Sequence, residues 1–144
     1  MRKIKVFISQ AMNGLSDDKI LKNRDKLFNR FKNSVINFYD EPVEVILIDS
    51  YVHDDPPKDA CEPVWYMAKS LEHLSKADVM IFESGAVQNR GCDIERHVCN
   101  AYGIPYISLA AINKPVQKIQ LEEVLGNICM RKQSLHQLDN DSDK

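Results

Sequence analysis

Four short apolar segments alternate with longer segments of helical periodicity, and this alternation limits the possible folds more than any other feature of the chain. The apolar segments cover residues 3–9, 43–48, 77–82 and 104–109. Between them, apolar residues recur at three- and four-residue spacing, which is typical of helices that cover a sheet. Because parallel strands need long crossover connections, this order predicts a parallel sheet with helices on both faces. We therefore expect a three-layer α/β sandwich with four to five parallel strands.

Length and charge exclude several classes of protein. The chain has 144 residues, which fits one domain, and its net charge of -2 gives no reason to expect binding to a nucleic-acid polymer. No apolar run reaches 18 residues, so we expect no membrane span. The N-terminus enters a predicted strand without a signal-peptide pattern, which favours the cytoplasm. We expect the domain to cover residues 1–136 and residues 137–144 to form a polar, disordered tail.

The first helical segment begins after Ser16, a good N-cap residue, and is expected to end near residue 33. Its basic residues lie among acids and asparagines, which favours a solvated face over a phosphate-binding stripe. These basic residues are Lys19, Lys22, Arg24, Lys26, Arg30 and Lys32. The four cysteines show no Cys-x-x-Cys spacing, so we expect neither a metal site nor a disulfide framework, and no cofactor.

The carboxyl ends of the predicted strands should meet at one edge of the sheet, where open α/β sheets bind ligands. Asp49 and Ser50 follow the second strand and would lie at this edge. The turn after the first strand also belongs there, and it would either cradle an anion or be a plain turn. The candidate binding residues of this turn are Ser9, Gln10, Met12 and Gly14.

The segment 89–95 contains the strongest candidate for chemistry. Gly91 is expected to open a helix after the third strand, with Glu95 in the first turn, where the helix dipole should keep its carboxylate ionised. Such a carboxylate is either a nucleophile or a stabiliser of an oxocarbenium-like centre, or it only complements the dipole. Asn89 could cap the turn or bind a sugar hydroxyl, and Arg90 could meet a phosphate.

We expect Ile94, Val98 and Ala101 to face the sheet, which would leave Glu95 at the edge of that face. Cys92 lies near the start of the same helix, where the pKa of a thiol can fall. His97 would point elsewhere on the helix, so a Cys–His nucleophile pair is not expected.

Three motifs, in this order, make the chain resemble the nucleoside 2-deoxyribosyltransferase-like superfamily. They are IKVFISQAMNG at 4–14, LSKADVMI at 74–81, and GCDIE at 91–95 followed by AYGIP at 101–105. The likeness spans roughly residues 3–109 and is strongest to a subgroup of small bacterial and phage proteins. It implies a single-domain flavodoxin-like or Rossmann-like fold and enzymes that cleave or transfer the N-glycosidic bond of nucleosides or nucleotides.

The resemblance also implies roles for individual residues. Glu95 matches the glutamate that attacks the anomeric carbon, Asn89 matches a residue that contacts the sugar, and Gly91 matches the turn glycine. The 9–14 turn matches the loop that holds the sugar or its 5′-phosphate. The resemblance further implies a homo-oligomer, a dimer or larger, in which neighbouring subunits complete the pocket.

Two positions depart from the family pattern. Ser70 stands where the enzymes usually carry an aspartate that protonates the leaving base or binds sugar, and serine is no comparable acid at neutral pH. Phe7 stands where the transferases have a tyrosine. Two further hypotheses therefore remain beside the enzyme: a non-catalytic module that binds or senses nucleotides, and a structural or partner-binding domain.

Overall fold

The computed structural model describes residues 1–10, 14–83, 89–109 and 116–142, with side chains up to residue 138. Strands and helices alternate strictly along the chain, as the sequence predicts. Their bounds are β1 Arg2–Ser9, α1 Asp17–Phe38, β2 Val43–Leu47, α2 Glu62–Leu74, β3 Val79–Glu83, α3 Arg90–Tyr102, β4 Tyr106–Leu109 and α4 Lys118–Ser142.

The four described strands form one sheet in the order β2-β1-β3-β4, and every neighbouring pair is parallel. Val6 at the centre of β1 pairs with Leu47 on one side and with Val79 on the other. The chain therefore moves outward from β1 to β2, crosses back to β3 and continues to β4. This confirms the predicted parallel α/β sheet and brings the carboxyl ends of all four strands to one edge.

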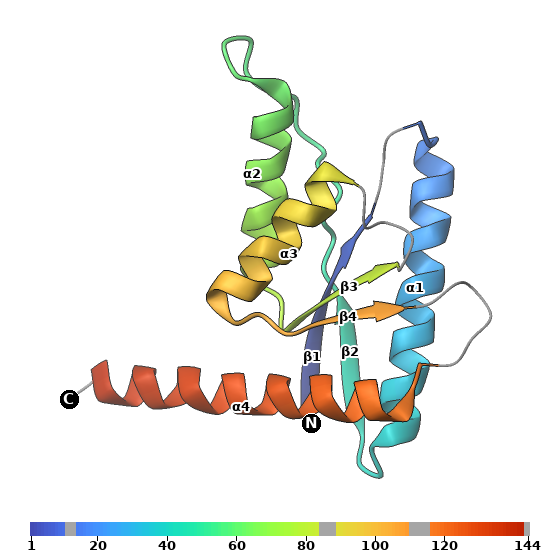
Figure 1. The fold of residues 1–144 in the computed structure, drawn as a ribbon, viewed down its shortest axis with the longest axis vertical. Helices are drawn as coiled ribbons and strands as arrows, with labels where there is room; N and C mark the ends of the chain where they lie inside the picture. The colour runs from blue at the N-terminus through green and yellow to red at the C-terminus, as the bar shows by residue number, and fades with distance from the viewer. Residues whose placement is uncertain (11–13, 84–88, 110–115, 143–144) are drawn as a thin grey trace.

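Two apolar layers enclose the sheet and make the fold a three-layer sandwich. Ile4, Val6 and Ile8 of β1 pack with α1 and α4 on one face, whereas Phe7 packs with residues of α2 and α3 on the other. Figure 1 shows α2 and α3 on one side of the strands and α1 on the other. Because side chains alternate along a strand, Ser9 follows Phe7 onto the face that α3 covers.

Two of the helix boundaries agree with the capping residues predicted from the sequence. Ser16 caps α1 by accepting a hydrogen bond from the N–H of Lys19, and Gly103 ends α3 with a left-handed φ of 70°, as predicted for both. The α1 helix is longer than expected and ends at Phe38 rather than near residue 33. Val35 extends its buried stripe by one turn, and packing against the sheet holds that turn in the helix.

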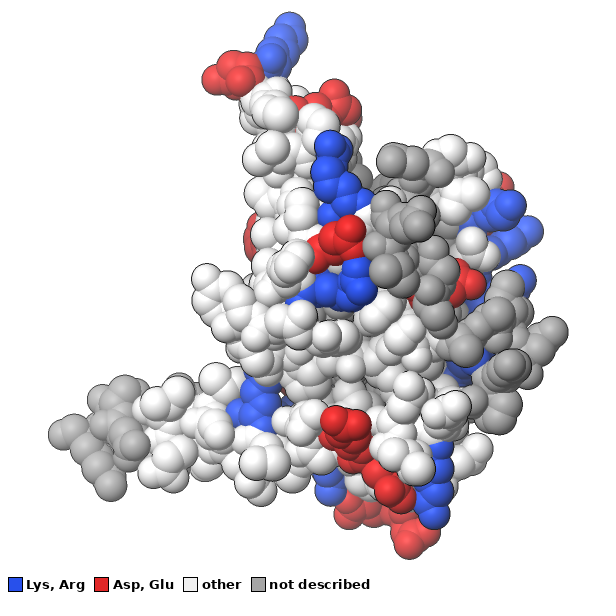
Figure 2. All heavy atoms as spheres, in the orientation of Figure 1, with Lys and Arg blue, Asp and Glu red and all other residues white. Residues whose placement is uncertain are grey.

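The C-terminal helix continues past residue 136, where the domain was predicted to end. Residues 137–142, expected to be a disordered tail, belong to α4. The first half of α4 packs on the sheet through Leu121, Leu125 and Ile128, and the C-terminal part continues past the body of the protein (Figure 1). Acidic and basic side chains are mixed over the face seen in Figure 2. None of the described helices combines the length and apolar character that a membrane crossing needs.

Candidate functional site

Glu95 lies in the second turn of α3, because the helix begins at Arg90. The expectation that Glu95 belongs to the first turn is therefore wrong, and Asp93 is the acidic residue found there. The favourable effect of the helix dipole on a carboxylate falls off within the first turn. The environment of the Glu95 side chain, rather than the dipole, must therefore decide its charge.

The buried face of α3 differs from the predicted one. Cys92, Glu95 and Cys99 are buried, whereas Ile94 is 37% exposed and Ala101 is also exposed. Val98, the third residue of the predicted face, is half-buried and does pack against the apolar layer. Residues 92, 95 and 99 follow the three- and four-residue spacing of one helix face. Glu95 therefore sits in the middle of the face that packs on the sheet, with only 5% of its surface exposed.

Among the residues that the structure describes, one hydrogen bond ties the Glu95 carboxylate to the sheet. The hydroxyl of Ser9, the last residue of β1, donates to Glu95 Oε1 at 3.1 Å, and Ser9 is itself 1% exposed. Burial raises the pKa of Glu95 to about 7, and the bond from Ser9 opposes this rise. The expectation of a fully ionised carboxylate is therefore wrong, and Glu95 is poised to gain or lose a proton near neutral pH.

Cys92 is not an activated thiol. It is 1% exposed, and this burial raises the pKa of its thiol instead of lowering it. Burial also raises the pKa of Cys99, on the same helix face, to about 12. His97 is exposed, so a Cys–His nucleophile pair is not assembled. Within the described residues, no three His, Cys, Asp or Glu side chains are grouped so that they could hold a metal ion.

The start of α3 is fixed by a cap and by a close contact with α2. Asn89 is the N-cap, and its Oδ1 accepts a hydrogen bond from the N–H of Cys92 at 3.1 Å. A Cβ atom on Gly91 would lie 3.3 Å from Asn89 Oδ1 and 3.3 Å from Met67 Cε. Gly91 therefore permits close approach, as predicted, while Arg90 is exposed beside it.

Ser70 is half-buried on α2. It lies three residues after Met67 and therefore on the same side of α2, which approaches the start of α3 through Met67. Ser70 is thus placed on the α3 side of its helix, but without an acidic group of its own.

The remaining predicted residues lie around the carboxyl edge. Asp49 follows β2 and accepts hydrogen bonds from the N–H of Tyr51 and, at 3.2 Å, from the ring of His53. The bond with His53 is the main reason that the pKa of Asp49 is lowered. Gly14 has a left-handed φ of 77°, which favours glycine, and Met12 lies outside the described residues. Gln10 turns toward α1, where its amide donates to the carbonyl of Ile20.

Arg24 of α1 is a functional candidate that the sequence interpretation missed. It was assigned to a solvated basic face, yet it is only 3% exposed. Its Nε donates to Gln10 Oε1 at 3.0 Å. The signal was present in the sequence, because Arg24 lies four residues after Ile20 and three before Leu27, within the buried stripe of the helix.

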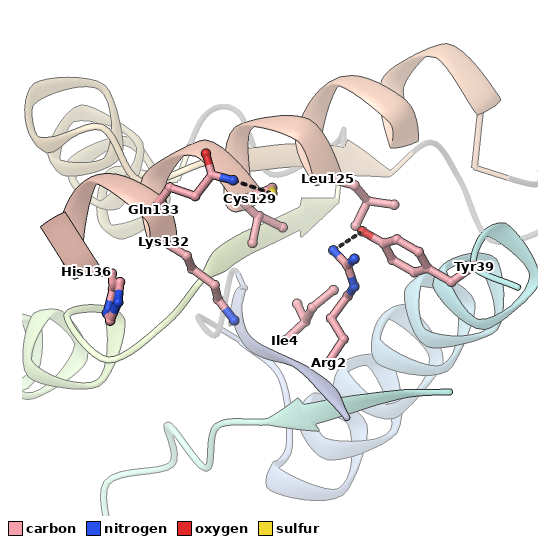
Figure 3. Close-up of a pocket in the computed structure, with 9 residues that line it drawn as sticks. Arg2, Ile4, Tyr39, Leu125, Cys129, Lys132, Gln133 and His136 are labelled. Atoms are coloured by element: carbon pink, nitrogen blue, oxygen red, sulfur yellow. Dashed lines mark hydrogen bonds between the residues drawn. The ribbon is translucent and has the colours of Figure 1, made fainter. Parts of the chain in front are cut away.

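A separate cavity of about 300 Å³ lies at the opposite edge of the sheet, between β1, the end of α1 and α4 (Figure 3). Its cations already have partners within the chain. Arg2 pairs with Glu41 at 2.8 Å and lies over the ring of Tyr39, while Lys132 pairs with Asp78 at 3.2 Å. We therefore place the candidate site at the carboxyl edge, around Glu95.

Comparison with family models and with curated protein sequences gives no significant match. Among solved structures, the chain is similar to a conserved protein from Enterococcus faecalis V583, with a TM-score of 0.52 and 15% sequence identity. The alignment covers 86% of this chain and 75% of that protein. At this identity the similarity supports the α/β fold alone.

Proposed function

We propose that the protein cleaves or transfers the N-glycosidic bond of a nucleoside or nucleoside 5′-monophosphate, with Glu95 as the nucleophile. One observation carries the proposal: the buried carboxylate of Glu95 accepts a hydrogen bond from the hydroxyl of Ser9 at the carboxyl edge of a parallel sheet. This edge is the usual ligand site of such sheets. A group whose pKa is strongly perturbed by burial at such a place is a candidate functional group.

The proposed reaction has two steps. A Glu95 carboxylate oxygen attacks the anomeric carbon, and the bond from that carbon to the base nitrogen breaks with its electron pair leaving on the base. The departing base takes up a proton from water. Water then attacks the anomeric carbon of the glycosyl ester, so that the sugar leaves and the carboxylate is restored. The proton that this water loses neutralises the hydroxide left by the first step. In a transferase, the nitrogen of a second base takes the place of this water and gives up its own proton.

Ser9 is expected to act as a positioning residue for Glu95, because its hydroxyl favours the ionised carboxylate. Ser9→Ala should move the acidic limb of the pH–rate profile to higher pH and lower the rate at pH 7 by about tenfold. Ser50→Ala is the control, since Ser50 is another buried serine near this edge. An unchanged profile for Ser9→Ala would remove this role.

A non-catalytic module that binds or senses nucleotides is the second candidate. Ser70 favours it, because the leaving base then has no carboxylic acid from that position to protonate it. Phe7 also favours it: the side chain is 1% exposed within the apolar layer and has no hydroxyl to offer Glu95.

A substrate panel distinguishes the two candidates. The purified protein is incubated with deoxynucleosides, ribonucleosides and their 5′-monophosphates, and free base is measured by chromatography. Release of one base would identify the substrate and support the enzyme. Thermal stabilisation by one nucleotide without any release of base over a long incubation would support the binding module instead.

A further inference from the structure

The guanidinium of Arg24 is buried at the carboxyl edge, and one of its nitrogens has no hydrogen-bond partner among the described residues. Its Nε donates to Gln10, but its Nη2 is buried and has no hydrogen-bond partner among the residues that the structure describes. A buried donor that stays unsatisfied costs free energy, and the cost is higher when the group is charged. An arginine with a merely structural role would be expected to use this donor.

Gln10 fixes the position of this guanidinium. Its Oε1 accepts from Arg24 at 3.0 Å, while its Nε2 donates to the carbonyl of Ile20 at 3.0 Å, so both ends of the amide are oriented. Gln10 directly follows Ser9, which holds Glu95. The Cα atoms of these two consecutive residues lie about 3.8 Å apart. The carboxylate of Glu95 and the guanidinium of Arg24 are therefore both hydrogen-bonded to the end of β1.

The charges around Arg24 leave it a cation. Burial lowers the pKa of Arg24, while Asp49 and Asp25 raise it, and an arginine stays protonated at any physiological pH. The carboxylate of Asp49 is used by Tyr51 and His53. By contrast, Arg2 at the other end of the sheet has a direct carboxylate partner.

We infer that Arg24, oriented by Gln10, forms an oxyanion subsite that binds the phosphate monoester of a nucleoside 5′-monophosphate. A guanidinium whose buried Nη2 has no partner among the described residues can donate to phosphate oxygens, and such charge-assisted bonds are strong in a water-poor site. That the phosphate belongs to a nucleotide rests on the proposed function. The binding of an oxyanion at Arg24 does not.

Thermal unfolding with inorganic phosphate tests the subsite directly. Phosphate at about a hundredfold its Kd should raise the Tm of the wild-type protein by roughly 9 °C. Arg24→Met should abolish the rise, whereas Lys26→Met, which removes an exposed charge two residues along the same helix, should keep it. No rise in the wild type, or an equal rise in Arg24→Met, would overturn the inference.

Two further comparisons keep the test independent of folding and of catalysis. If Arg24→Met fails to fold, Arg24→Lys replaces it in the test. The lysine variant retains a charge at the site and should show a smaller rise in Tm than the wild type. An undiminished rise in this lysine variant would also count against the subsite. Arg24→Met should weaken binding of the 5′-monophosphate by at least about tenfold and leave that of the nucleoside unchanged. Glu95→Gln should retain the phosphate response, so that failure of the glycosidase proposal and failure of the subsite are distinguishable.

Discussion

Glu95→Gln is expected to lower the rate of base release by about 10⁴-fold, because an amide cannot form the glycosyl ester. Glutamine has nearly the same shape, and its carbonyl oxygen can still accept the hydrogen bond from Ser9. The fold should therefore be retained, and a circular dichroism spectrum would check this. The rate is measured as free base released in a single turnover.

The wild-type rate should also depend on pH in a defined direction. The nucleophile is the ionised carboxylate, and burial places the pKa of Glu95 at about 7. The rate should therefore fall about tenfold for each pH unit below this value and reach a plateau above it.

Glu72→Gln, which removes an exposed carboxylate of α2, is the control and should keep the wild-type rate and profile. Equal rates for Glu95→Gln and the wild type would exclude Glu95 as the nucleophile.

Glu95→Gln should also make the protein more stable at alkaline pH. The pKa of Glu95 is about 7 in the folded protein, against an ordinary value of 4.5 in the unfolded chain. Above pH 7, folding therefore buries a charge, and the difference between the two pKa values corresponds to about 3 kcal/mol of lost stability. Glutamine carries no charge, so the free energy of unfolding at pH 8 should be up to about 3 kcal/mol higher for Glu95→Gln.

The stability difference between Glu95→Gln and the wild type should change with pH in one direction. Between pH 4.5 and 7 the folded protein binds more protons at Glu95 than the unfolded chain, so wild-type stability falls as pH rises through this range. The advantage of Glu95→Gln should therefore shrink below pH 7 and disappear near pH 4.5. Urea unfolding at pH 8 and pH 5 measures it. A glutamine variant that is less stable than the wild type at pH 8 would show that Glu95 has a structural role.

The slower reaction of Glu95→Gln and its higher stability at alkaline pH would have one physical origin, the burial of the carboxylate. A group that costs stability in the folded protein is retained when its chemistry requires the burial. The buried guanidinium of Arg24 follows the same logic at the same edge of the sheet. Two polar groups, Glu95 and Arg24, would then each be held by one neighbouring side chain of the β1 end, Ser9 or Gln10, ready for a ligand.

The architecture could be predicted from the sequence because its signals are local. The parallel sheet follows from the alternation of apolar and helical segments, and the N-cap Ser16 and the C-cap Gly103 each depend on a few neighbouring atoms. The position of Glu95 near the carboxyl edge followed from this order of elements. The pattern of elements was therefore sufficient to find the region of the candidate site.

The details of the site depend on packing between distant segments, which local patterns do not contain. The predicted rotation of α3 was wrong for Ile94 and Ala101, which are more apolar than Glu95, because the sheet buries the Cys92, Glu95 and Cys99 face. The charge of Glu95 was wrong because burial outweighs a dipole effect that decays within one turn. Arg24 was missed because its residue type suggested solvent although its spacing indicated the core.

The most direct test of Glu95 as nucleophile is a search for the covalent intermediate. The protein is mixed with the substrate that the panel identifies and quenched in acid within one turnover, and its peptides are analysed by mass spectrometry. We expect the mass of one glycosyl group on the peptide that contains Glu95, and none on the same peptide of Glu95→Gln. Base release without an adduct on this peptide, or an adduct on another residue, would contradict the account.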